Sequence, residues 1–289
     1  MHHGSQLKKF LLFALLPLSI FAVVLFYPFA QGLYLTFTNW DGFSHDKYVG
    51  IANYTKSLKD PEFWSTLRFT MKYVVVSLVA INAVAFGLAL LVTAKLKSSN
   101  LFRTFFFVPN LIGGVVLGVI WQFVFNTALV SISNKMGWSL FANSWLGETN
   151  TAFWALIIVT VWQSSGYMMI IYITGLISIE QDVLEAARVD GASALRTLWA
   201  IKMPLMAQAF TISLFLTLRG GFMAYDVNVA LTGGGPFRTT ELISMHIFQD
   251  AFAFGNFGTG QSKAVLMFIM VATAALIQVT VSKRMEAKA

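Results

Sequence analysis

Cysteine is absent from all 289 residues of this chain, and charged residues make up only 11% of it. The lack of cysteine excludes disulfides, thiolate metal ligands and cysteine nucleophiles, although it indicates no particular redox compartment. With so few charges beside 57% hydrophobic residues, the chain is far more apolar than a soluble domain of this length needs to be. The composition therefore predicts an integral membrane protein.

Motifs for nucleotide binding and catalysis are missing as well. No Gly-Lys dipeptide occurs, which excludes a phosphate-binding P-loop, and neither His-Glu-x-x-His nor Gly-x-Ser-x-Gly is present. A membrane enzyme, one alternative for so apolar a chain, thus lacks its usual residues. A secondary transporter, a second alternative, should carry an internal repeat and several buried ionisable groups, whereas only Arg219 and Asp226 qualify.

Long charge-free stretches are what the sequence has instead. Each approaches or exceeds the roughly 20 helical residues that cross a bilayer, and lipid cannot satisfy the backbone of an open strand. We therefore expect an all-α membrane protein with a single polytopic domain over residues 1–289. The approximate spans are 10–35, 73–94, 104–126, 152–177, 203–225 and 264–283, of which the fifth is interrupted by Arg219.

A cleavable signal peptide is the alternative interpretation of the first span, because Lys8 and Lys9 precede it. The run from 10 to 27 is long for a signal peptide, and Pro28 occupies the small-residue position of a cut after Ala30. The sequence leaves open whether residues 1–5 are native.

Basic residues indicate the orientation. The connections 1–9, 95–103, 180–202 and 283–289 hold 11 Lys and Arg in 48 residues, whereas 41–72, 126–148 and 226–263 hold 8 in 93. Cytoplasmic connections are the ones enriched in Lys and Arg, so both termini should be cytoplasmic in a bacterial-type inner membrane. The net charge of +7 then follows from topology, and the scattered basic residues do not predict nucleic-acid binding.

A polar segment, 178–204, lies between the fourth and fifth predicted spans. Ser178 stands three residues before Gln181, a capping-box spacing that predicts a helix beginning near Ile179. We expect Gly191 to end this helix in a left-handed conformation and Ser193 to cap a second one. Pro204 suits the first turn of the next span. Alanines at 186 and 187 would let a partner approach the first helix closely, and Glu185 would offer it a carboxylate.

The spacing within this segment carries a resemblance. Glu-Ala-Ala at 185–187, Gly191 and Ile-Lys-Met-Pro at 201–204 resemble the EAA loop of the membrane subunits of binding-protein-dependent ABC importers. Met203 stands where that pattern usually has Leu. The resemblance implies a type I ABC importer permease fold, with a coupling helix docking on a cytoplasmic ATPase through Glu185, Ala186, Ala187, Gly191, Ile201, Met203 and Pro204. An ordinary amphipathic interfacial loop is the alternative.

Other motifs are similar to those of the maltose-type, or MalF-like, sugar permeases. They include Tyr-Pro at 27–28, the run 35–40, Phe-Asn at 125–126 and Leu-Thr-Gly-Gly-Gly-Pro at 231–236. The resemblance implies import of a carbohydrate, expected to be an oligosaccharide, delivered by an extracellular solute-binding protein. It also implies a second homologous permease and two ATPase subunits that bind ATP and Mg²⁺, with no cofactor on this chain. Glycerol phosphates or sugar acids are the alternative substrates.

Polar and aromatic residues within the spans are candidates for the substrate path, because sugars need hydrogen bonds and flat apolar surfaces. For any single Trp or Tyr, an interfacial position in the bilayer is an equal alternative. For Arg219, the alternatives are lining the path, snorkelling, or a structural pair with Asp226 on the same helix face. His45 and His246 are expected to be solvated and to hold no metal. The candidates are Asn110, Gln122, Trp162, Gln163, Tyr167, Arg219, Tyr225, Asp226 and Asn228.

Overall fold

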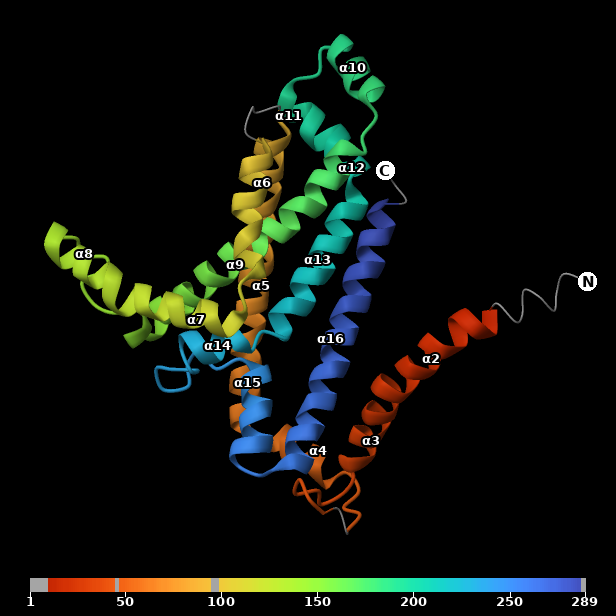
Figure 1. Cartoon of the computed structure of the whole chain (residues 1–289), viewed down its shortest axis with the longest axis vertical. Helices are drawn as coiled ribbons and strands as arrows, with labels where there is room; N and C mark the ends of the chain where they lie inside the picture. The colour runs from red at the N-terminus through yellow and green to blue at the C-terminus, as the bar shows by residue number, and fades with distance from the viewer. Residues whose placement is uncertain (1–9, 45–46, 95–98, 287–289) are drawn as a thin grey trace, which may run out of the picture. The chain divides into compact units, whose positions relative to one another are not determined.

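A computed structural model describes residues 10–44, 47–94 and 99–286, and helices account for most of them (Figure 1). The predicted all-α architecture is confirmed. The chain divides into two compact units, Met1–Phe63 with Ile247–Met267, and Trp64–His246 with Phe268–Ala289. Several residues used above lie outside the described part of the chain, namely residues 1–5, Lys8, Lys9, His45, Lys95, Lys97 and Lys288.

Five described helices are long and apolar enough to cross a membrane, and a bent pair of segments gives a sixth if it is one broken span. The five helices are Leu11–Leu35, Pro61–Thr93, Gly114–Met136, Thr149–Ile177 and Phe257–Arg284. The pair, Ala194–Leu205 and Ala207–Phe222, meets at 71°. Six spans are therefore compatible with the helices, as the charge-free stretches predict.

The first unit begins with an apolar helix whose side chains are exposed within this chain. Its segments are η1 (Leu11–Leu15), α2 (Leu16–Phe21), η2 (Ala22–Phe26) and α3 (Tyr27–Leu35), and α4 (Ala52–Lys59) follows. The amide of Asn53 on α4 donates to the carbonyls of Thr36 and Thr38 at 2.8 Å each. These bonds fix the chain where it leaves the first helix.

Charged side chains reinforce the same unit. The ammonium group of Lys263, which is 3% exposed, lies 2.6 Å from a carboxylate oxygen of Asp60 and 2.8 Å from one of Asp250. Lys263 belongs to α16 (Phe257–Glu286), and Asp250 to the π-type turn η7 (Gln249–Ala253) that follows α15 (Ile243–Phe248). Burial of one cation against two carboxylates thus joins three separate segments.

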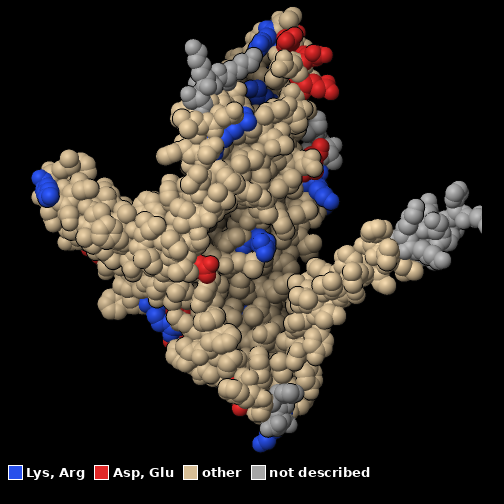
Figure 2. Space-filling view, viewed as in Figure 1, with Lys and Arg blue, Asp and Glu red and all other residues tan. Residues whose placement is uncertain are grey.

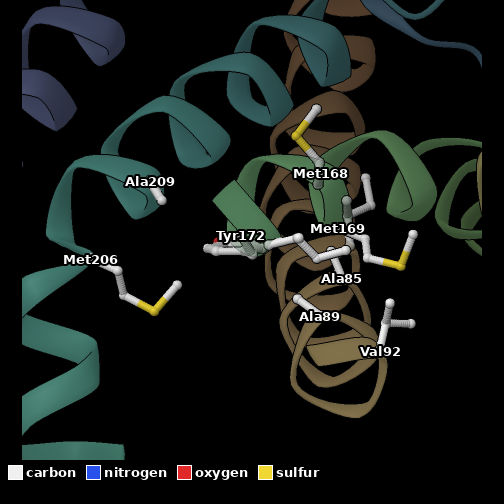
Figure 3. Close-up of a cluster of buried hydrophobic side chains, with 10 residues drawn as sticks. Ala85, Ala89, Val92, Met168, Met169, Tyr172, Met206 and Ala209 are labelled. Atoms are coloured by element: carbon white, nitrogen blue, oxygen red, sulfur yellow. The ribbon is translucent and has the colours of Figure 1, made fainter. Parts of the chain in front are cut away.

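The second unit is built on α5 (Pro61–Thr93), α9 (Thr149–Ile177) and α13 (Ala207–Phe222). Small and flexible side chains fill the space between these helices, with Ala85 and Ala89 from α5 and Met168 and Met169 from α9 (Figure 3). Alanines allow backbones to approach closely, and the unbranched methionines fit the remaining irregular space. Met206 closes the cluster at the bend before α13.

The third predicted span, 104–126, is divided in the structure. α6 (Ser99–Phe107) passes into a short 3₁₀ turn, η3 (Val108–Leu111), and the chain resumes as α7 (Gly114–Phe123), η4 (Val124–Ala128) and α8 (Leu129–Met136). Figure 1 shows α7 and α8 turning away from the direction of α6. Pro109 has no amide hydrogen to donate, which accounts for the end of α6 just before it. The backbone then leaves the helical conformation at Ile112 and Gly113, whose ψ angles are 126° and 139°. The charge-free interval gave no sign of this break.

A close approach between α6 and α9 depends on Gly166. A Cβ atom on Gly166 would lie 1.8 Å from the carbonyl oxygen of Phe106, a backbone atom that cannot move aside alone. At Gly87 on α5, by contrast, a Cβ atom would have nothing within 4 Å. Substitution of Gly166 by alanine therefore tests this contact, and the same substitution at Gly87 is a matched control.

We predict that Gly166→Ala destabilises the protein, whereas Gly87→Ala does not. The overpacked contact should cost at least about 1–3 kcal/mol, and Gly87→Ala should be neutral or stabilising by up to ~1 kcal/mol because alanine favours helix. Thermal unfolding of the detergent-solubilised protein measures both changes. Equal melting temperatures for the two variants would contradict the packing of α6 against α9.

Candidate functional site

The segment 178–204 forms two short helices joined by a turn. α10 spans Gln181–Val189, and α11 (Ala194–Thr197) continues through the π-type turn η6 (Leu198–Lys202) into α12 (Met203–Leu205). Gly191 has φ +72°, and the amide of Ala192 donates to the carbonyl of Ala187 at 2.9 Å. The hydroxyl of Ser193 accepts from the amide of Arg196 at 3.3 Å. The left-handed glycine and the second cap are therefore confirmed.

The predicted capping box at the start of α10 is wrong. The hydroxyl of Ser178 donates to the carbonyl of Gly175 at 2.8 Å, so it serves the end of α9 rather than the start of α10. α10 begins after Glu180, and no side chain caps it. A serine between two helices can satisfy either terminus, and the local pattern does not say which.

The exposed surface of the loop differs from the one expected. Ala187 is buried within this chain, so a partner cannot approach both alanines, whereas Glu185 and Ala186 are exposed. Val189 is 88% exposed, and Leu195 and Trp199 are exposed as well. Figure 2 shows charged side chains gathered over the α10 and α11 end of this unit. The loop thus presents isolated apolar side chains among charges.

The rest of the EAA-like pattern lies at the approach to α13. Ile201 belongs to η6, and Met203 and Pro204 to α12, all of them half-buried. Pro204 occupies the first turn of α12, as predicted, where its missing amide hydrogen costs nothing. α12 ends at Leu205, and Met206 separates it from α13. The pattern therefore leads directly into the 71° bend.

A cavity of about 320 Å³ lies in the second unit. Its wall is formed by α5, α7, α9 and α13 together with residues 223–227. Three of the predicted path residues, Gln163, Tyr225 and Asp226, line it. The other lining residues are Tyr73, Ser77, Ile81, Gly114, Thr160, Ser164, Met168, Leu216, Thr217, Gly220, Gly221, Met223, Ala224 and Val227.

Four hydroxyl residues on the wall, Tyr73, Ser77, Thr160 and Thr217, were not among the predicted path residues. Tyr73 and Ser77 are four residues apart on α5, and Thr160 and Ser164 are four apart on α9, so each pair shares a helix face. Tyr73 and Thr160 lie 2.9 Å apart through their hydroxyl oxygens. Repeated hydroxyls at this spacing in apolar spans were the available signal, and the prediction of path residues did not use it.

Two amides on the list have structural partners. Asn228, fully buried on α14 (Asp226–Leu231), donates to the carbonyl of Thr240 at 2.7 Å and accepts from the amide of Leu242 at 3.1 Å. The amide of Gln122 on α7 lies 3.5 Å from the carbonyl of Leu231 on α14. Both residues hold α14 in place, and a role in substrate passage stays a prediction for them.

The remaining candidates lie off the wall of this cavity. Trp162 lines a separate apolar cavity of about 470 Å³ and packs against Trp121, with ring centroids 5.5 Å apart. Asn110 and Tyr167 are absent from the residues that line the 320 Å³ cavity. For these three residues, a role in the path is still a prediction.

One of the alternatives for Arg219, a structural pair with Asp226 on the same helix face, is wrong. α13 ends at Phe222 and α14 begins at Asp226, so the two residues do not share one helix face. No salt bridge joins them in the described part of the chain. Arg219 is exposed and is not among the lining residues, whereas Asp226 is.

A buried charge cluster follows the Leu-Thr-Gly-Gly-Gly-Pro run. Glu241 is 2% exposed, receives a hydrogen bond from the Arg238 guanidinium at 3.0 Å and lies 3.0 Å from Nδ1 of His246. The prediction that His246 is solvated is therefore wrong, because His246 is only 3% exposed and its ring contacts Glu241. Burial acts to raise the pKa of Glu241, but the hydrogen bonds and charges of His246 and Arg238 outweigh it and lower that pKa below its ordinary value of 4.5.

Comparison with known proteins identifies the family. Residues 81–287 match the model of the binding-protein-dependent transport system inner membrane component. The chain is 43% identical to the probable starch degradation products transport system permease AmyD of Thermoanaerobacterium thermosulfurigenes, over 93% of this chain and 91% of that one. This chain belongs to the binding-protein-dependent ABC permease family. It is a multi-pass inner membrane transport subunit, which removes the membrane-enzyme and secondary-transporter alternatives.

Other relatives of this permease include the multiple sugar-binding transport permease MsmF of Streptococcus mutans, 30% identical over 95% of each chain. Among solved structures, a bacterial alginate ABC transporter in complex with an alginate-bound periplasmic protein matches with a TM-score of 0.84. That match is 18% identical and covers 99% of both chains. It shows that the permease has the fold of an ABC importer membrane subunit, as the EAA-like spacing implied.

The lowered pKa of Glu241 gives the permease a pH-dependent stability. The ionised carboxylate stabilises the folded state at pH values above 4.5, and this contribution is lost as the pH falls through the lower pKa of the folded protein. We predict that Glu241→Gln lowers the free energy of unfolding by about 1–3 kcal/mol at pH 7. The difference from the wild type should shrink below pH 4.5.

Thermal unfolding of the purified permease between pH 7 and pH 4 measures this difference. Glu148→Gln, which changes an exposed carboxyl, is the control and should stay within about 0.5 kcal/mol of the wild type. A pH-independent effect of Glu241→Gln would show that ionisation of Glu241 plays no part.

Proposed function

We propose that this permease translocates a carbohydrate delivered by an extracellular solute-binding protein. ATP would be hydrolysed by separate ATPase subunits, which bind the permease at α10. The observation that carries the proposal is the helix–turn–helix of 181–205, which closes on left-handed Gly191 and presents Val189 to solvent. The full assembly would contain a second homologous permease and two ATPase subunits holding ATP and Mg²⁺. Both termini and α10 would then be cytoplasmic.

Contact with an ATPase is supported by the side chains that α10 exposes. An apolar side chain as exposed as Val189 gains stability only when another surface covers it. Ala186 and Glu185 lie near it in sequence, so a partner could bury the valine, approach the alanine and offer a donor to the carboxylate. This surface is smaller than the one expected from the sequence, since Ala187 faces inward.

Transmission from α10 to the cavity is supported by chain continuity. The loop runs through η6 and α12 into α13, and α13 contributes Leu216, Thr217, Gly220 and Gly221 to the cavity wall. A displacement of α10 is therefore carried by the backbone to a helix that borders the cavity. The bend at Met206 is the point where a change of angle would reorient α13.

A carbohydrate substrate is supported by the wall and by the relatives. Hydroxyls of Tyr73, Ser77 and Thr160, the amide of Gln163 and the ring of Tyr225 provide hydrogen bonds and an aromatic face of the kind that sugars need. AmyD is named for starch degradation products and MsmF for multiple sugars. We infer a starch-type oligosaccharide as the first substrate to test.

We predict that Val189→Asp reduces transport at least about tenfold, because it places an unpaired charge in the contact that the ATPase would bury. The measurement is co-purification of an ATPase subunit with the permease, together with oligosaccharide uptake by cells carrying the variant. Gln181→Ala changes an exposed residue of the same helix and serves as the control. Normal uptake by the Val189→Asp variant would refute the proposal that α10 is the coupling element.

The function as a whole is tested in proteoliposomes that contain the complete transporter. Uptake of a labelled maltooligosaccharide should require the binding protein. It should also require ATP on the side of the membrane that the ATPase subunits face. Uptake that does not depend on ATP, or a purified complex that contains no P-loop ATPase, would refute the proposed function.

A further inference from the structure

The cavity carries a single charge. Asp226 is the one charged residue among the described residues that line it, and the other polar lining groups are hydroxyls and one carboxamide. The cation nearest to it in sequence, Arg219, is not part of the wall. A ligand in the cavity therefore meets neutral hydrogen-bonding groups and one negative charge.

Packing holds Asp226 at this position. It begins α14, and a Cβ atom on Gly114 of α7 would lie 2.7 Å from the Cβ of Asp226. One turn further, a Cβ on Gly118 would lie 2.5 Å from the Cβ of Ala230. Two glycines of α7 thus allow α14 to lie directly against it. Since Asn228 is also bonded to the carbonyl of Thr240, α14 cannot readily turn Asp226 away from the wall.

The neutral part of the wall offers no compensating cation. Tyr73 and Thr160 already bond to each other, and Gln163 donates to the carbonyl of Ile112 at 3.2 Å. Such groups can exchange hydrogen bonds with a sugar hydroxyl, but they cannot neutralise a carboxylate or phosphate on a ligand. An anion in this cavity would face Asp226 without a counter-charge on the wall.

We propose that Asp226 is a specificity-determining residue that makes the cavity select neutral sugars over sugar acids and sugar phosphates. The inference rests on the proposed function, in which this cavity is part of the substrate path. It separates this permease from relatives named for anionic substrates, such as the sn-glycerol-3-phosphate permease UgpA of Brucella abortus, 29% identical to it. A like charge a few ångströms away, partly screened by protein and water, disfavours an anion by roughly tenfold or more.

The charge of the cavity can be measured without any sugar, because a thiol introduced into this 289-residue sequence is its only one. Ser164→Cys places one thiol on the wall, and methanethiosulfonate reagents of opposite charge probe it in the assembled complex. Labelling is read on the 32.0 kDa permease band. The ratio of the cationic to the anionic labelling rate should fall about tenfold when Asp226→Asn is added.

Arg219→Gln in the Ser164→Cys background is the matched control, and it should change the ratio less than Asp226→Asn does, since Arg219 is not among the residues that line the cavity. An unchanged ratio with Asp226→Asn, or a larger shift with Arg219→Gln, would overturn the proposal. Gly220→Cys is a second probe site, because a Cβ there has nothing within 4 Å. If neither thiol reacts, the cavity is closed to ligands and the proposal fails.

The second arm compares substrates in proteoliposomes with one binding protein. The probes are maltotriose and maltotrionic acid, which differ by oxidation of the reducing end to a carboxylate. Asp226→Asn should raise the ratio of acid to neutral uptake about tenfold, and the selectivity of the binding protein cancels between the two permeases. An unchanged ratio would refute the role of Asp226 while leaving sugar import intact. Absence of ATP-dependent uptake of maltotriose by the wild type would refute the proposed function itself.

Discussion

Lipid offers no hydrogen bonds, so every polar group inside the spans must find its partner within the protein, and Asn82 shows how this builds the core. Its amide donates to the carbonyl of Leu78 at 2.7 Å and to the hydroxyl of Thr217 at 3.0 Å, and its carbonyl accepts from Tyr172 at 2.7 Å and Ser213 at 2.6 Å. One side chain thereby fixes α5, α9 and α13 against each other. The rest of the second unit depends on this junction.

α13 connects this junction to both functional parts of the permease. Ser213 and Thr217 face Asn82, Thr217 and Gly220 belong to the cavity wall, and the helix begins at the bend that follows the α10–α12 loop. A helix so placed cannot move without altering either the polar junction or the cavity. Under the proposed function, ATP-driven displacement of α10 would therefore move the part of α13 that borders the sugar-binding cavity. Asp226, on the wall of the same cavity, would repel negatively charged substrates.

The sequence predicted the features that follow from local chemistry. Charge-free stretches predicted long apolar helices, which the structure contains. The spacing around Gly191 and Ser193 predicted the turn and the second cap because glycine conformation and serine capping act over a few residues. Features set by tertiary packing were missed: the burial of Ala187, the burial of His246 beside Glu241 and the end of α13 before Asp226. The break of the third predicted span after Pro109 was missed as well, because the prediction relied on the absence of charges alone. Tyr73, Ser77, Thr160 and Thr217 were overlooked because each hydroxyl is an ordinary residue of its helix until α5, α9 and α13 bring them to one cavity.

The most direct test of the central claim is a cross-link from α10 to its partner. Ala186→Cys provides the only thiol of this chain on the exposed face of α10, and a short bifunctional reagent can be attached to it in inside-out membrane vesicles. The account predicts an adduct between the permease and a P-loop ATPase subunit. Labelling of this cysteine by a membrane-impermeant reagent from outside intact cells, with no ATPase adduct in vesicles, would contradict it.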